Sequence, residues 1–280
     1  MKNTAPSVNE FVTLSTQLIA EKDPGSAAAL AEQLWRTTYR SQIADSERAL
    51  LASAHQETLR YGSGVLNTYT WGTGTPVLLL HGWNGRAGQM AEIAIAMAEA
   101  GFKATALDFP AHGESSGHET DVLEMISAIQ HLNQVKGAFH SVITHSFGSV
   151  GLLQAVLQGM RVDRVVCVSA PADIETLLDK FTSLLKLSDQ VISLLKKRLE
   201  KTYGVEFWRT YSVQEMSRQM TMPGLLIHDS DDEYIGIGHM FEINAAWQAS
   251  DILSTQGLGH NKILNDPSVI RAITQFCCAE

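Results

Sequence analysis

The sequence predicts an α/β fold: a doubly wound, mostly parallel sheet with a helical cap insertion and an N-terminal helical arm. From about Tyr61 onward, short apolar strand patterns alternate with helical patterns, which is the order that a parallel sheet requires. Between Pro171 and Pro223 the alternation stops, and leucines recur at spacings of three and four. We therefore expect an arm over residues 1–60, a main domain over 61–280 and a cap over about 171–222.

The arm is expected to be helical because alanine is abundant and glycine is absent between Ala27 and Tyr61. Pro24-Gly25 separates a first helical segment from a second one over about 26–59. The arm contains no chemical motif. We expect it to pack on the main domain or on a second subunit, and the second arrangement would make the protein a homo-oligomer.

The main domain shows its strands and helices in regular order. The continuous apolar run 77–80 is typical of a strand that is buried on both faces of a parallel sheet. Further strands are expected at 65–71, 103–107, 141–144, 164–168, 224–228 and 252–255, and helices at 87–100, 120–135, 150–157, 240–249 and 267–277. Ligands of such sheets bind outside the carboxyl ends of the strands, where all the motifs described below fall.

Composition disfavours several classes of function. The chain has 21 Lys and Arg against 30 Asp and Glu, a formal net charge of −9, so nucleic acid and anionic membrane surfaces are not expected partners. Three cysteines, two of them adjacent, do not form a disulfide framework, which favours a cytoplasmic location. The N-terminus lacks an apolar core of the secretory type, and no apolar stretch approaches the length of a membrane span. We therefore expect no stable membrane insertion.

Ser146 stands between a predicted strand and a predicted helix. Residues 141–144, which are all β-branched or small, lead into His145-Ser146-Phe147-Gly148, and a helical pattern follows. A serine at a tight strand-to-helix turn has the geometry of a nucleophile elbow, because the turn lifts its hydroxyl clear of the sheet. The alternative interpretation is that the serine only caps the helix.

The segment His81-Gly82-Trp83 directly follows the buried strand at 77–80. Gly82 allows a tight turn, which would leave the N–H of Trp83 free to form an oxyanion hole with the N–H of Phe147. A simple strand-ending turn is the alternative. After the next strand, Asp108 and His112 lack a third ligand at a suitable spacing, so we expect a structural loop and no metal site.

Two further segments end the last strands of the sheet. Residues 228–233 contain four carboxylates without the spacing or the glycine of an EF-hand, so we expect one of them to orient a histidine. His260 follows the last strand and is well placed to act as a base. The chain order is then serine, acid, histidine, which characterises one arrangement of the catalytic triad.

Together, the five segments at 81, 108, 144, 228 and 257 resemble the α/β-hydrolase superfamily, in the correct order and over about residues 60–278. The resemblance implies that Ser146 is the nucleophile and His260 the general base, and that Trp83 and Phe147 are the oxyanion-hole donors.

The family's loop of the form His-Gly-x-x-Asp aligns with residues 228–232 and selects Asp232 as the acid, with Asp231 as its rival. Two positions depart from the family pattern. Thr144 replaces the usual glycine two residues before the nucleophile, and Asp229 replaces the glycine after His228.

We therefore expect a serine hydrolase that cleaves a small-molecule carboxylic ester through an acyl-enzyme and needs no cofactor. Part of the apolar face of the cap is expected to bind the acyl group, through Leu178, Phe181 and Leu185. Thioester or carbon–carbon bond hydrolysis by the same triad is one alternative. A non-catalytic ligand-binding or scaffold protein on the same fold is another.

Overall fold

The structure, a computed structural model, describes residues 8–279. Residues 1–7, which were compared above with a secretory leader, and residue 280 lie outside the described residues. The chain divides into two compact units. The sheet unit comprises Thr38–Ala172 and Ser212–Glu280, and the helical unit comprises Met1–Thr37 and Asp173–Tyr211. Among the described helices, none has the length and apolar character needed to span a membrane.

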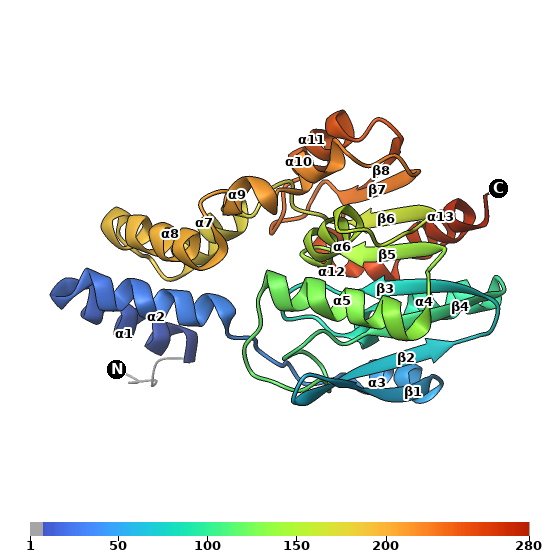
Figure 1. Cartoon of the computed structure of the whole chain (residues 1–280), viewed down its shortest axis with the longest axis horizontal. Helices are drawn as coiled ribbons and strands as arrows, with labels where there is room; N and C mark the ends of the chain where they lie inside the picture. The colour runs from blue at the N-terminus through green and yellow to red at the C-terminus, as the bar shows by residue number, and fades with distance from the viewer. Residues whose placement is uncertain (1–7, 280) are drawn as a thin grey trace. The chain divides into compact units, whose positions relative to one another are not determined.

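The sheet unit is built on one eight-stranded sheet in the order β1-β2-β4-β3-β5-β6-β7-β8 (Figure 1). The pairs β1–β2 and β2–β4 are antiparallel, and all other neighbours are parallel. The strands are β1 (His55–Tyr61), β2 (Gly64–Trp71), β3 (Thr75–Leu80), β4 (Phe102–Leu107), β5 (Ser141–His145), β6 (Arg164–Val168), β7 (Gly224–Asp229) and β8 (Ser250–Thr255). The predicted doubly wound, mostly parallel sheet is confirmed.

Helices cover both faces of this sheet, with α5 and α6 on one face and α4 and α13 on the other (Figure 1). The helices of the unit are α3 (Asp45–Ala52), α4 (Ala91–Glu99), α5 (Val122–Lys136), α6 (Gly148–Leu157), α10 (Val213–Ser217), α11 (Gly238–Ala246), α12 (Gly259–Lys262) and α13 (Pro267–Cys278). Two 3₁₀ turns, η1 (Ala87–Met90) and η2 (Ile263–Asn265), precede α4 and α13.

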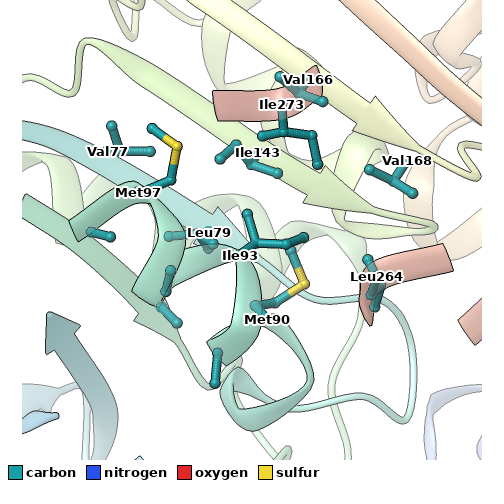
Figure 2. Close-up of a cluster of buried hydrophobic side chains, with 14 of the residues drawn as sticks. Val77, Leu79, Met90, Ile93, Met97, Ile143, Val166, Val168, Leu264 and Ile273 are labelled. Atoms are coloured by element: carbon teal, nitrogen blue, oxygen red, sulfur yellow. The ribbon is translucent and has the colours of Figure 1, made fainter. Parts of the chain in front are cut away.

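The core between the sheet and α4 follows from the alternation of side chains along the strands. Every second residue of β3, β5 and β6 faces the same side and is buried there against α4 and the C-terminal helices. Figure 2 shows this cluster, which includes Val77, Leu79, Met90, Ile93, Met97, Ile143, Val166, Val168, Leu264 and Ile273. The opposite side chains of β3 are buried as well, which is why residues 77–80 form an unbroken apolar run.

The structure differs from the helix predicted over residues 26–59. The helix α2 ends at Arg36, α3 covers Asp45–Ala52, and His55–Tyr61 is the edge strand β1. β1 pairs with β2 through a tight turn at Gly62, whose φ of 55° favours glycine. Leu59 is the only buried residue of this strand, so β1 has no apolar alternation that could distinguish it from a helix.

The helical unit contains α1 (Val8–Lys22), α2 (Pro24–Arg36), α7 (Glu175–Leu184), α8 (Asp189–Tyr203) and α9 (Phe207–Thr210). Asp23 caps α2 by accepting the N–H of Gly25, and Pro24 occupies the first turn. Trp35 of α2 packs edge-on against Phe181 of α7, with ring centroids 5.3 Å apart. Glu32 of α2 pairs with Arg198 of α8 at 2.6 Å. The first two helices and the insertion thus form one compact unit.

Candidate active site

Ser146 lies in the sharp turn between β5 and α6 and has a φ of 51°, in the left-handed region that non-glycine residues rarely adopt. The turn is held from both sides. The N–H of Ser146 donates to the carbonyl of Val168 at 2.9 Å, and its carbonyl accepts from Ser149 at 3.1 Å. A strained backbone that is fixed by its surroundings is characteristic of functional turns and is the geometry expected of a nucleophile elbow.

Thr144, which replaces the usual glycine, is fully buried beneath this turn. Its hydroxyl donates to the carbonyl of Val166 at 3.1 Å and pairs with the hydroxyl of Ser149 at 2.7 Å. The larger side chain is therefore accommodated because both of its hydrogen-bonding roles are satisfied within the turn. Ser149, in the first turn of α6, is the residue that makes this substitution compatible with the elbow.

The 81–86 loop, which follows β3, lies directly against the serine turn. A Cβ on Gly82 would stand 2.8 Å from the Cβ of Ser146, so only glycine permits this approach. The rings of Trp83 and Phe147 meet edge to face, with centroids 5.7 Å apart. Within the described residues, neither the N–H of Trp83 nor that of Phe147 is engaged in a hydrogen bond. Two unpaired N–H donors thus belong to the residue after Ser146 and to the loop that packs against it.

Two histidines fix the 81–86 loop. His81 accepts the N–H of Phe109 at Nε2 and donates from Nδ1 to the carbonyl of Gly82. His112 accepts the N–H of Asn84 at Nε2 and donates from Nδ1 to the carbonyl of Pro110. Burial lowers the pKa of His81 well below its usual range and that of His112 to about 4, so both rings are neutral. All four ring nitrogens serve backbone groups, consistent with a structural loop.

Asp108 holds the other end of the same loop. Its carboxylate, almost fully buried, accepts the N–H of Ala87 at 2.7 Å and the N–H of Glu114 at 2.9 Å. Burial raises the pKa of Asp108 to about 6, against the effect of these two donors. Asp108 therefore joins the segment that follows Trp83 to the loop that follows β4.

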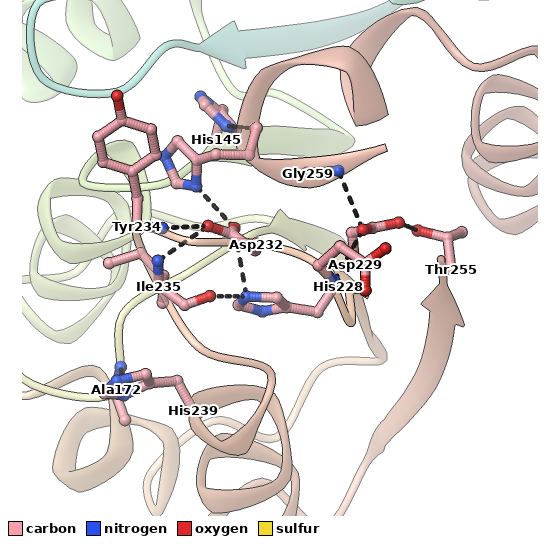
Figure 3. A network of polar contacts seen from close by, with 12 residues as sticks. His145, Ala172, His228, Asp229, Asp232, Tyr234, Ile235, His239, Thr255 and Gly259 are labelled. Atoms are coloured by element: carbon pink, nitrogen blue, oxygen red, sulfur yellow. Dashed lines mark hydrogen bonds and ion pairs between the residues drawn. The ribbon is translucent and has the colours of Figure 1, made fainter. Parts of the chain in front are cut away.

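His260 and Asp232 form a direct pair. Nδ1–H of His260 donates to Oδ2 of Asp232 at 2.7 Å. Oδ1 of Asp232 accepts the N–H groups of Tyr234 and Ile235 at 2.9 and 2.8 Å (Figure 3). Burial opposes ionisation of Asp232, but hydrogen bonds from His228, His260 and Ile235 outweigh it and hold its pKa well below the usual range. The acid is therefore ionised, and it orients the histidine so that Nε2 is the acceptor.

The neighbouring carboxylates do not contact His260. Asp231 is exposed, and its side chain accepts only from the hydroxyl of Ser230, at 3.3 Å. Asp229 is buried and points to the loop that follows β8, where it accepts the N–H of Gly259 (Figure 3). The aspartate that lies against the histidine is thus Asp232.

His145 links the serine turn to the histidine. Its Nε2–H donates to the carbonyl of His260 at 2.8 Å, and the two rings lie 4.7 Å apart. Burial, with His260 close by, lowers the pKa of His145 to about 3, so the ring is neutral. The residue next to Ser146 therefore touches the backbone of His260, which brings the serine turn and the His260–Asp232 pair into one site at the carboxyl ends of β5, β7 and β8.

The three cap residues lie in the helical unit. Leu178 and Leu185 are buried, and Phe181 is half-buried against Trp35. The sequence did not indicate that the side chains of His81, His145 and Asp229 hold the site, and it placed His112 only in a structural loop, yet all four take part in the hydrogen bonds that hold the site. Position is the signal for His81, His145 and Asp229, since each directly follows or ends a strand, whereas His112 lies further along the loop that follows β4.

The chain matches a family model described as alpha/beta hydrolase fold over residues 75–207. No curated protein sequence matches it significantly. Among solved structures, a thioesterase domain from the curacin biosynthetic pathway has a TM-score of 0.61 at 16% identity, covering 81% of this chain and 99% of that one. An esterase from a Rhodococcus species has a TM-score of 0.62 at 16% identity, with coverages of 81% and 99%.

A meta-cleavage product hydrolase from Pseudomonas fluorescens has a TM-score of 0.59 at 15% identity, covering 80% of this chain and 98% of that one. At such identities, the solved structures report on the fold. The family match over residues 75–207 and the eight-stranded, mostly parallel sheet together show that this chain has the alpha/beta hydrolase fold.

Proposed function

We propose that this chain is a serine hydrolase that cleaves a carboxylic ester through an acyl-enzyme intermediate. The observation that carries the proposal is the 2.7 Å hydrogen bond between His260 and Asp232, formed beside the strained turn that presents Ser146. An ionised, buried acid that fixes a histidine tautomer next to an elbow serine is the arrangement that activates a hydroxyl as a nucleophile.

In the proposed first step, Oγ of Ser146 attacks the ester carbonyl carbon, and its proton passes to Nε2 of His260. Nε2 accepts the proton because Nδ1 already carries a hydrogen that is bonded to Asp232. The negative charge develops on the carbonyl oxygen, where the N–H groups of Trp83 and Phe147 stabilise it. The intermediate then collapses: the carbon–oxygen bond to the alcohol breaks, and His260 returns the proton to the alcohol.

In the second step, water attacks the acyl-enzyme and gives a proton to His260. The ester bond to Ser146 then breaks, the serine recovers its proton, and the carboxylic acid leaves. Every proton in the cycle moves through one imidazole, so the orientation of His260 by Asp232 matters in both halves.

Two other outcomes have specific support. The similar structures include a thioesterase domain and a meta-cleavage product hydrolase, so the same triad on this fold could act on a thioester or a carbon–carbon bond. A non-catalytic ligand-binding or scaffold role is the alternative of another class. The hydrogen bond between an ionised Asp232 and His260, which a binding role does not require, argues for turnover.

The test is a panel of aryl esters and thioesters of increasing acyl length, together with a vinylogous 1,5-diketone. Each is assayed with the wild type and with Ser146→Ala. Ester hydrolysis that falls by about 10³-fold or more in the variant supports the proposal. Faster turnover of thioesters or of the diketone would assign one of the other reactions. Absence of turnover on all substrates would favour the non-catalytic role.

A further inference from the structure

Asp229 is the last residue of β7, and its side chain is completely buried. Its carboxylate accepts three hydrogen bonds. Its Oδ1 accepts the N–H of Asp231 at 3.0 Å. Oδ1 also accepts the N–H of Gly259 at 2.9 Å, and Oδ2 accepts the hydroxyl of Thr255 at 2.6 Å (Figure 3). Each bond is charge-assisted, so it is stronger than a bond between neutral groups.

Two of the three donors precede the acid and the histidine in the chain, and the third, Thr255, is the last residue of β8. Asp231 directly precedes Asp232, and Gly259 directly precedes His260. The backbone pairing of β7 with β8 ends at Asp229 and Thr255, where Ser230 still donates to the carbonyl of Thr255. Beyond this point the two strands are no longer paired, and the carboxylate of Asp229 links the segments that follow them.

We propose that Asp229 is a positioning residue of the site. By holding the N–H of Gly259, it keeps His260 at the distance from Asp232 at which the 2.7 Å bond forms. This inference rests on the proposed function, in which His260 is the base. Asp229 touches no reacting atom and acts only through the backbone on either side of the pair.

The charge state of Asp229 fits this role. Burial opposes ionisation, but the donors at Thr255, Gly259 and Asp231 lower the pKa of the carboxylate below its usual range. An ionised carboxylate offers only acceptors, so it can hold all three donors at once. Asp229, which replaces the glycine that the family loop has after His228, thus holds the backbone before His260, and Asp232 remains the acid.

Asp229→Ala and Asp229→Asn test the proposal on an ester substrate. Asp229→Ala should lower kcat by about 10- to 100-fold with KM within about twofold, because a base displaced by about 1 Å loses its alignment but not the binding surface. Asp229→Asn should stay within about threefold of wild type, since its amide oxygen can accept both N–H groups and Thr255 can turn its hydroxyl to accept the amide N–H.

Asp266→Ala is the matched control. Asp266 also accepts two backbone N–H groups and one hydroxyl, from Ser268 and Val269 at the start of α13, and it makes no contact with the catalytic pair. This variant should lose stability and keep its kcat. If Asp266→Ala and Asp229→Ala lower kcat equally, the loss reflects general destabilisation, and the positioning role is excluded.

A second readout does not depend on turnover. Nuclear magnetic resonance should show faster hydrogen exchange at the Gly259 amide in Asp229→Ala, and faster exchange of the Nδ1 proton of His260, with both restored in Asp229→Asn. Unchanged exchange together with a wild-type kcat would overturn the inference. If Asp229→Ala does not fold, Asp229→Ser, whose shorter hydroxyl cannot reach both amides, replaces it. An inactive wild type would refute the proposed function. The exchange rates would still show whether Asp229 holds Gly259 and His260 in place.

Discussion

Replacing Asp232 with asparagine exchanges one oxygen for an amino group and keeps the size of the side chain. The structure dictates how the new amide must lie. Oδ1 of Asp232 accepts two backbone N–H groups, from Tyr234 and Ile235, and an amino group at that position would face two donors. The amide oxygen must therefore take the Oδ1 position, which points the amino group at Nδ1 of His260.

The forced amide orientation selects the wrong tautomer of the histidine. An amino group donates, so Nδ1 of His260 must become the acceptor and its hydrogen must move to Nε2. Nε2 then cannot take the proton of Ser146. The corresponding substitution in a serine-protease triad lowers kcat by about 10⁴-fold. At about 1.36 kcal/mol for each factor of ten, the loss of transition-state stabilisation is about 5 kcal/mol.

The assay compares kcat for ester hydrolysis in Asp232→Asn with that in Asp231→Asn. Asp231 is the exposed neighbour and makes no contact with His260, so its variant should stay within about threefold of wild type. Circular dichroism and a urea titration of both variants confirm that each is folded. A loss of less than about tenfold in Asp232→Asn, or a larger loss in Asp231→Asn, would refute the assignment of the acid.

Three further predictions concern the surroundings of the pair. Gly82→Ala places a methyl group 2.8 Å from the Cβ of Ser146, so kcat should fall by about 10²-fold or more, and an unchanged kcat would exclude a role for the 81–86 loop. The three buried histidines of the site have lowered pKa values and Asp108 a raised one. Between about pH 4 and 6, these three histidines are protonated in the unfolded chain and neutral in the folded chain, whereas Asp108 is protonated only in the folded chain. At these four groups the unfolded chain therefore binds about two more protons than the folded chain. Stability should accordingly drop by about 2–3 kcal/mol per pH unit as the pH falls below 6.5, and equal urea midpoints at pH 7 and 5 would contradict this. Shortening the side chain of Leu178, Phe181 or Leu185 in the cap should shift the preference for acyl length. If such a variant loses stability but keeps the ratio of kcat/KM between short and long esters, these residues have only a packing role.

The sequence predicted the sheet and the order of the motifs because both leave a direct trace in the residues. A strand that is buried on both faces must be an apolar run, as at 77–80, and the functional loops of a parallel sheet follow such runs directly. The strand β1 has no such apolar run. It is an edge strand with a single buried residue, Leu59, and backbone pairing with β2 determines its conformation.

Contacts between distant residues could not be predicted in the same way. The packing of α2 against α7 and α8 joins Trp35 to Phe181 and Glu32 to Arg198, and neither pair has a signature in the local sequence. The exchange of hydroxyl hydrogen bonds between Thr144 and Ser149 is more local, but it depends on the rotamers of the two side chains. Hydrophobic periodicity carries no information about such polar pairs.

Labelling by a fluorophosphonate tests most directly whether Ser146 is an activated nucleophile. The probe reacts with a serine whose hydroxyl is deprotonated by a neighbouring base, and it makes no demand on the structure of the natural substrate. Intact mass and peptide mapping should show one adduct, on Ser146, in the wild type and none in Ser146→Ala, with labelling slowed by orders of magnitude in His260→Ala. A folded wild type that is not labelled, or one that is labelled at another residue, would contradict the account.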